Sequence, residues 1–204
     1  MDVLAVVAAQ EQDFVLLAGV PIVCRSVRLL LAVDVVRHVM VLIPDEHRER
    51  AVRTCAGLPV TVRTGAGDLA PSTGIVLMHE ATRALAPSAL AVAVLDAVRA
   101  GHRAAVPVLP LADTVKRVDA SGRVRAASDR SALRVVQSPV AFRADLMRGG
   151  ELMGGGGNAT ALDLVRACAL ADDPVHPVPG DPMAFPVRTP WEVELAEMFM
   201  ARAL

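Results

Sequence analysis

The side chains that most often carry chemistry are scattered along this chain. Three cysteines (Cys24, Cys55 and Cys168) are odd in number and form no CxxC pair, so we expect reduced core thiols, without a disulfide framework or a zinc site. Four histidines have no carboxylate or cysteine partner at metal-ligand spacing: His38, His47, His102 and His176. The most suggestive pair is Glu80 and Arg83, a carboxylate and a guanidinium just after a short apolar run. From the residues alone, they could equally form an ordinary loop ion pair.

The composition limits what kind of molecule can position such a pair. The chain has 204 residues, of which 53% are hydrophobic, 21% are charged and only 2% are aromatic, and its net charge is −1. This much apolar material argues against disorder and suits a single domain spanning residues 1–204. A near-neutral charge and few stacking rings argue against nucleic acid as a partner.

Nothing in the sequence indicates a membrane partner or export. The apolar run at the N-terminus, Val3 to Ala9, has no basic segment before it, unlike a signal peptide. No uncharged apolar stretch approaches the roughly 18 residues that a membrane span needs. We therefore expect a soluble cytoplasmic protein.

Short β-branched runs alternate with amphipathic segments. The apolar runs predict strands at 3–9, 39–43, 75–78 and 104–109, and the helical patterns lie at 21–32, 45–55, 87–100 and 191–204. Strands that are apolar on both faces are typical of a buried parallel sheet. The order predicts an α/β fold, with a mainly parallel sheet and helices on both faces.

The pattern changes after residue 110. Two polar, basic runs, Thr114 to Val118 and Arg123 to Arg125, flank a turn sequence at Asp119 to Gly122, which predicts a β-hairpin. Because these strands would sit poorly in a core, we expect them to project as an arm, at about 112–136. Four glycines at 154–157 are expected to form a linker.

Six ordered pieces of the chain resemble one enzyme family. The run Val76-Leu77-Met78-His79-Glu80-Ala81-Thr82-Arg83 resembles the "VHDAAR" segment of the methylerythritol-phosphate cytidylyltransferases, the CTP-dependent IspD enzymes of the non-mevalonate isoprenoid pathway. Further pieces follow in order at 106–108, 113–118, 129–133, 136–142 and 179–185, the last resembling "GDPxNxK". This resemblance implies a Rossmann-like nucleotidyltransferase sheet and a homodimer, in which the hairpin arm crosses the partner.

The resemblance fails where that family binds the triphosphate. The family has a Gly-rich loop with an Arg and a Lys after its first strand, whereas here only Ala8 and Ala9 match. The short loop that follows carries two acids, Glu11 and Asp13, which would repel a triphosphate. The nucleotide-binding remnant is therefore Ala8, Ala9 and, from a second eroded Gly motif, Gly65.

The sequence departs from the family at further positions in the nucleotide-binding half of the expected site. The helix that should follow the second Gly motif is missing from residues 64–74. The family's catalytic Lys falls at Pro186, with Arg188 as a possible substitute cation two residues later. The family's Thr-acid pair falls at Asn158-Ala159, where this sequence has neither a Thr nor an acid.

The other half of the expected site matches the family more closely. By resemblance, Glu80 stands at the family's Mg²⁺-associated Asp, and Arg83 matches a catalytic Arg. Thr114, Arg130 and Ser138 fall at positions that hold the sugar phosphate, the Arg reaching across the dimer. Each residue also has a simpler interpretation: Thr114 as a β-branched strand residue, and Arg130 as a solvated charge. His79, beside this group, is expected to be an ordinary strand-end histidine.

The combined hypothesis is a divergent homologue of the family. It would transfer CMP from CTP to 2-C-methyl-D-erythritol 4-phosphate with impaired or absent catalysis, using Mg²⁺ at Glu80. Two alternatives stay open. The chain could remain active with Arg188 or arm residues as substitute cations. It could also be a non-catalytic protein that binds a phosphorylated sugar or pairs with an active relative.

Overall fold

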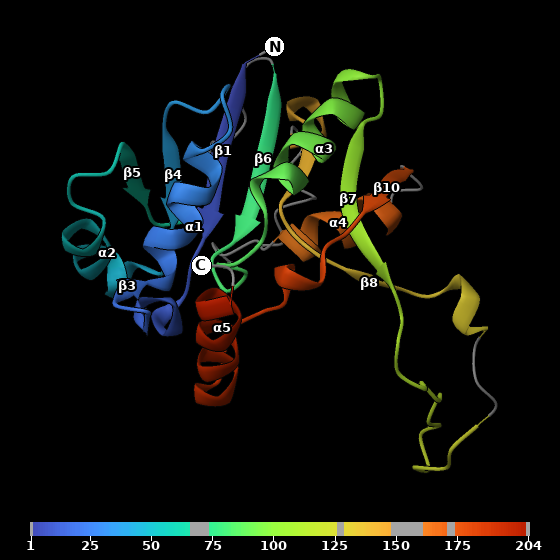
Figure 1. Ribbon diagram of the computed structural model, residues 1–204. Coiled ribbons are helices and arrows are strands. Elements are labelled where there is room, and N and C mark those ends of the chain that lie inside the picture. The colour runs from blue at the N-terminus through green and yellow to red at the C-terminus, as the bar shows by residue number, and fades with distance from the viewer. Residues whose placement is uncertain (1, 66–73, 126–128, 148–160, 171–173, 203–204) are drawn as a thin grey trace.

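A mixed β-sheet forms the centre of the molecule (Figure 1). The computed structural model describes residues 2–65, 74–125, 129–147, 161–170 and 174–202. The sheet follows the order β10-β7-β9-β6-β1-β4-β5, and β8 pairs with the end of β7. Its strands are β1 (Val3–Ala8), β4 (Val39–Leu42), β5 (Val60–Arg63), β6 (Ile75–Glu80), β7 (Ala104–Pro110), β8 (Arg134–Val136), β9 (Val140–Arg143) and β10 (Val175–Pro179). The four strands expected from the sequence are present within one or two residues.

Most of the pairing is parallel, as predicted. β1 lies between β4 and β6 and pairs with both in parallel, and β10 pairs with β7 in the same way. Two strands are antiparallel: β9 runs between β6 and β7, and β8 pairs with the end of β7. The inserted strand β9 returns the chain to the sheet centre after the arm.

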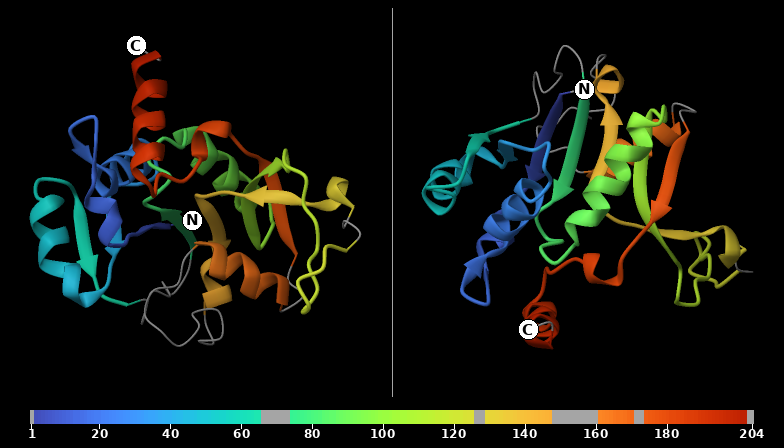
Figure 2. Two further views of the ribbon diagram at one scale, coloured as in Figure 1. Left: turned by 90° about the horizontal axis from the view of Figure 1, so that it is seen from below. Right: turned by 45° about the horizontal axis from the view of Figure 1, so that its top comes forward.

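Helices cover both faces of the sheet (Figure 2). They are α1 (Ile22–Leu31), α2 (Arg48–Thr54), α3 (Ser88–Arg99), α4 (Ala161–Leu170) and α5 (Pro190–Arg202). Alternate side chains along a strand point to opposite faces. Accordingly, Ala5 and Val7 join the core beneath α1, α2 and α3, whereas Val6 joins the core on the α4 side. The prediction of helices on both faces is confirmed.

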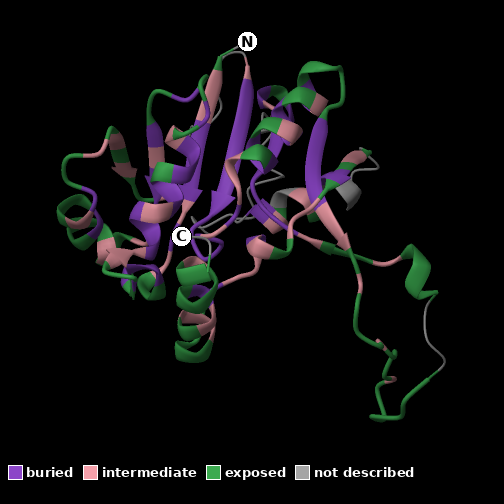
Figure 3. Ribbon diagram, viewed as in Figure 1, coloured by how far each residue is buried: buried purple, intermediate pink, exposed green. Residues whose placement is uncertain are grey.

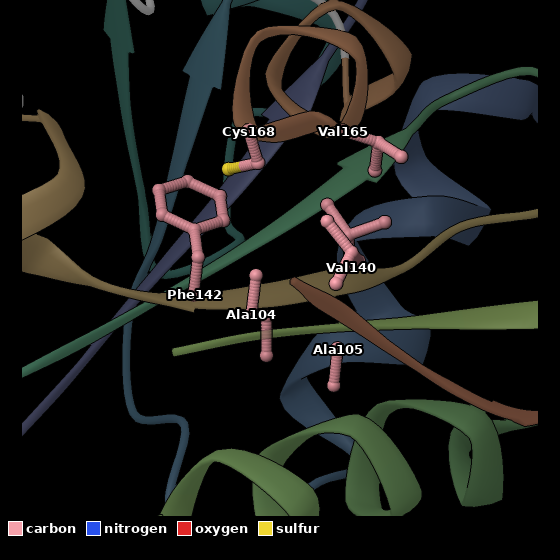
Figure 4. A pocket seen from close by; sticks show the side chains of 8 residues that line it. Ala104, Ala105, Val140, Phe142, Val165 and Cys168 are labelled. Atoms are coloured by element: carbon pink, nitrogen blue, oxygen red, sulfur yellow. The ribbon is translucent and has the colours of Figure 1, made fainter. Parts of the chain in front are cut away.

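The α4 face retains a small apolar pocket (Figure 4). Val165 and Cys168 of α4 face Val140 and Phe142 of β9, with Ala104 of β7 below them. Its volume is about 10 Å³, so the packing is close to complete there. Cys168 is buried and reduced, as are Cys24 and Cys55.

Residues 111–125 and 129–133, between β7 and β8, project from the body as an exposed arm (Figures 1 and 3). Its hairpin is smaller than predicted, because the two expected strands reduce to a single bridge between Val118 and Val124. Asp119 organises the turn by accepting hydrogen bonds from the backbone of Ser121 and Arg123. Exposed polar strands gain little from burial, which explains why a longer ladder does not form.

A short hairpin and the C-terminal helix complete the lower edge of the molecule. β2 (Leu16–Leu17) and β3 (Val20–Pro21) pair just before α1, and Leu17 and Ile22 share a small core with Ala196 of α5. None of the helices in the described ranges is both long and apolar enough to cross a membrane. The expected linker at 154–157 lies outside the described residues.

Candidate functional site

The candidate site lies where β1 and β6 end together. Ala8 and Glu80, the last residues of these strands, are register partners. The Ala81 N–H donates to the Ala8 carbonyl at 2.9 Å, and the Ala9 N–H donates to the Leu42 carbonyl at 2.9 Å. In open α/β sheets, ligands bind outside the carboxyl ends of the strands. The sheet therefore brings Ala8, Ala9 and Glu80 to one edge.

Glu80 and Arg83 form a buried ion pair at this edge. Arg83 Nε lies 3.1 Å from Glu80 Oε2, and the two side chains are only 6% and 8% exposed. The guanidinium also donates to the Ala184 carbonyl at 2.6 Å and to the Val136 carbonyl at 3.2 Å. Burial lowers the pKa of Arg83, and the Glu80 charge opposes that shift. Arg83 thus joins three segments that are far apart in the sequence.

Ser138 is fully buried behind Glu80, together with His79. Its Oγ accepts a hydrogen bond from the Glu80 N–H at 3.0 Å and lies 3.1 Å from His79 Nδ1. Burial, assisted by the Arg83 charge, lowers the pKa of His79 to about 3, although the Arg83 carbonyl opposes the shift. His79 is therefore a neutral ring within the protein, and the Ser138 hydroxyl has its partners in the core.

The loop after β1 places an acid at the same edge. It forms a short 3₁₀ helix, Glu11–Phe14, in which Asp13 is 1% exposed and Glu11 is exposed. Asp13 Oδ2 accepts from the Gln10 N–H at 2.7 Å, whereas Oδ1 is buried with no hydrogen-bond partner in the described part of the chain. Burial raises the pKa of Asp13 to about 7. The Gln10 N–H and the Arg188 charge oppose this rise, and the Glu80 charge adds to it.

Arg188 lies beside this group on an exposed segment. Its charge acts on both Asp13 and Arg83. The segment is anchored by the Val187 N–H, which donates to the Thr82 carbonyl at 2.8 Å. Arg188 is thus a cation near the site, and its charge favours the ionised form of the Asp13 carboxyl.

Gln137 supports this arrangement, although no role was predicted for it from the sequence. The residue is 2% exposed, and its side-chain amide donates to the Asp181 carbonyl at 2.8 Å, while its Oε1 accepts from the Asp181 N–H at 2.9 Å. Position 180 requires a glycine, because a Cβ atom added there would lie only 2.9 Å from the Val108 carbonyl oxygen. Both sides of this contact, Gln137 and the Gly-Asp-Pro turn at 180–182, lie in sequence pieces that resemble the family, which was the available signal.

The remaining expected site residues lie elsewhere. Thr114 and Arg130 are exposed on the arm, which leads away from the Glu80 edge of the same chain (Figure 1). Arg130 donates to the Ala112 carbonyl at 3.3 Å. Gly65, with φ of +79°, follows β5. Residues 66–73 and Asn158-Ala159 lie outside the described part.

The donors for a magnesium ion are incomplete at this edge. Within the described ranges, no three His, Cys, Asp or Glu side chains gather as metal ligands. Glu80 already gives one oxygen to Arg83. Magnesium is often held by one or two carboxylates together with substrate phosphates. The residues present therefore fit the protein carboxylate of such a site, and the substrate phosphates would have to supply the other ligands.

Comparison with known proteins decides the family. The profile of the family described as "IspD: 2-C-methyl-D-erythritol 4-phosphate cytidylyltransferase" matches residues 6–202. The chain belongs to this family. A 2-C-methyl-D-erythritol 4-phosphate cytidylyltransferase of Nocardia farcinica is 40% identical over 201 residues, covering 93% of this chain and 85% of that protein. A relative of the same name from Rhodococcus jostii is 35% identical over 197 residues, covering 92% and 85%.

Solved structures agree with the cytidylyltransferase fold. The enzyme of that name from Thermus thermophilus has a TM-score of 0.77 and 25% identity, covering 98% of this chain and all of its own. The 4-diphosphocytidyl-2C-methyl-D-erythritol synthase of Anaerococcus prevotii has a TM-score of 0.82 at 18% identity, covering 98% of each chain. The predicted nucleotidyltransferase fold is therefore confirmed, and the chain is a homologue of the isoprenoid-pathway cytidylyltransferases.

Proposed function

We propose that this member of the cytidylyltransferase family carries out transfer of CMP from CTP to 2-C-methyl-D-erythritol 4-phosphate poorly or not at all. The observation that carries the proposal is the burial of Asp13 in the loop after β1, close enough to Glu80 and Arg188 to interact electrostatically with both. In the resembling enzymes, this loop supplies glycines and cations to the triphosphate.

The electrostatics of that loop oppose nucleotide binding. Two unit charges 4 Å apart interact by about 4 kcal/mol at an effective dielectric constant near 20. An ionised Asp13 would add repulsion of this kind to an incoming triphosphate, and Arg188, the nearby cation, is already attracted to Asp13. Each lost charge contact to a transition state reduces the rate by roughly 10²–10³-fold. Weak or absent turnover follows.

Magnesium belongs to the same proposal. Glu80 would supply a carboxylate oxygen, and phosphate oxygens of the substrate would complete the coordination. Bound there, Mg²⁺ would offset the negative charge of the phosphates. Arg83 would keep the Glu80 carboxylate in place through the 3.1 Å contact.

Pyrophosphate release tests the proposal. The purified chain is incubated with CTP, Mg²⁺ and 2-C-methyl-D-erythritol 4-phosphate, and the Nocardia farcinica relative serves as the positive control. We expect release at least about a thousandfold slower than in the control, from the loss of the loop cations. Turnover at an ordinary enzyme rate of about 1 s⁻¹ or more would overturn the proposal.

The second candidate is a non-catalytic protein that holds the phosphorylated sugar or pairs with another chain. The exposed arm, with Thr114 and Arg130, favours it. Calorimetry with 2-C-methyl-D-erythritol 4-phosphate alone would then show binding that is lost in Arg130→Gln. Light scattering tests the homodimer expected through the arm, and a strict monomer at high concentration would remove that expectation.

A further inference from the structure

A second concave surface lies on the helical side of the loop that follows β6. It is an open hollow of about 330 Å³ between α1 and the start of α3, here called the α1–α3 hollow. Its lining includes Arg25, Arg28, Ala32, Ala84, Ala86 and Ser88. The alanines leave the space open, and the arginines supply its charge. Pockets that hold small molecules begin at about this volume.

The two arginines give the hollow an excess of positive charge. Arg25 is fixed, because its Nε donates to the Leu17 carbonyl at 2.8 Å. Arg28 is exposed, and its side chain makes no hydrogen bond or ion pair within the described ranges of the chain. Burial lowers the pKa of Arg25, and the Arg28 charge lowers it further, while Glu197 of α5 opposes the shift. None of the residues that line the hollow is acidic.

The start of α3 adds to the positive electrostatic potential of the hollow. Ser88 is the first residue of this 12-residue helix and lines the hollow. Pro87 precedes it and offers no side-chain cap, and the first turn contains no acid. The first N–H groups of a helix and its dipole favour an anion at that end. Here they add to the positive charge of Arg25 and Arg28, which line the same hollow.

We propose that the α1–α3 hollow binds a small phosphorylated anion, of the phosphomonoester class, separately from the Glu80 edge. Guanidinium groups form strong charge-assisted hydrogen bonds with phosphate oxygens. The loop at 81–87 separates the two places: Arg83 reaches Ala184 on one side, and Ala84 and Ala86 line the hollow on the other. The inference does not depend on whether the chain transfers CMP.

Calorimetry with inorganic phosphate, on the full chain at low salt, tests this site. We expect saturable binding that weakens about tenfold or more in Arg28→Gln and disappears in Arg28→Glu. Arg37→Gln is the matched control, since Arg37 is also an exposed arginine near α1 but does not line the hollow. Its affinity should stay within about twofold of the unmodified chain.

Two further measurements locate the phosphate. The amide resonances of Ala86 and Ser88 should shift during a phosphate titration, and Arg130→Gln should leave the affinity unchanged. Circular dichroism checks that each variant is folded, which is expected because Arg28 is exposed. The proposal is wrong if phosphate does not saturate the protein, if Arg28→Gln behaves like Arg37→Gln, or if Arg130→Gln removes the binding.

Discussion

Gln137 and Asp181 hold each other through two reciprocal hydrogen bonds. The Gln137 amide donates to the Asp181 carbonyl at 2.8 Å, and its oxygen accepts from the Asp181 N–H at 2.9 Å. This contact joins the end of β8 to the turn after β10. The chain then continues through a 3₁₀ helix, Pro182–Ala184, to Val187 and Arg188. The position of Arg188 at the site thus depends on Gln137, an uncharged residue outside the site.

Gln137→Ala should therefore destabilise the protein by about 2 kcal/mol, because two partly buried backbone groups lose their partner. Urea denaturation measures the change. Gln12→Ala is the matched control, since Gln12 is exposed, and its effect should stay within about 0.5 kcal/mol. Equal effects of the two substitutions would contradict the structural role of Gln137.

Arg83→Met should be strongly destabilising, by about 3–5 kcal/mol, because it leaves the Glu80 carboxylate buried without its counter-charge. The double variant with Glu80→Gln removes that charge as well, so it should recover at least about 1 kcal/mol of the loss. Chemical denaturation of the two single variants and the double variant gives the comparison. If the double variant is no more stable than Arg83→Met, the buried charge is not the cause.

Asp13 should make stability depend on pH. The pKa rises from 3.8 to about 7 on folding, so the folded protein keeps a proton that the unfolded chain releases between these values. This contribution is complete below pH 3.8 and is lost as the pH rises through 7. Its full size is on the order of 4 kcal/mol. Asp13→Asn cannot ionise, so it should gain stability relative to the unmodified chain at pH 8 and not at pH 4.

Urea midpoints of both proteins between pH 4 and 8 provide this measurement. His79 acts in the opposite direction: its pKa falls from 6.5 to about 3, so stability is lost as the pH falls through that range. Both proteins contain His79, and the difference between them isolates Asp13. A difference that does not change with pH would show that Asp13 is ionised in both the folded and the unfolded state.

Asp13→Asn should also improve nucleotide binding at pH 8, where the Asp13 carboxyl of the unmodified chain is ionised. Removing one negative charge beside the expected phosphate position should tighten CTP binding by about tenfold. Calorimetry with CTP and Mg²⁺ measures this change. Glu11→Gln is the control, because Glu11 belongs to the same loop but its side chain is 71% exposed. An equal gain in both variants would point to general loop charge instead of the buried carboxyl.

Six of the elements that the sequence predicted share one property, a marked apolar pattern. β1, β4, β6 and β7 are continuous apolar runs, and α1 and α3 have clear apolar faces. The missed strands are short or contain proline: β10 is Val175–Pro179 with two prolines, a composition that usually argues against a strand. β9 has only four residues, and its place depends on pairing with β6 and β7. Such pairing is decided by tertiary contacts that a local pattern does not contain.

The candidate site was also predicted only in part. Resemblance located Glu80 and Arg83, and the structure brings them together, whereas the sugar-phosphate roles of Thr114, Arg130 and Ser138 stay predictions. The internal bonds of Ser138 were not foreseen, because its partner Glu80 is 58 residues away. The burial of Asp13 was also missed, since an acid in a polar loop is normally exposed.

The position of β9 also determines when the sheet can be completed during synthesis. β6 ends at Glu80, but the strand that covers its edge begins only at Val140, after β7 and the arm have been made. All six residues of β6 are buried in the finished protein. At about 5–20 residues per second, the ribosome needs roughly 3–12 s to produce the intervening chain. During that interval, the nascent protein presents an apolar, unpaired strand edge to its surroundings.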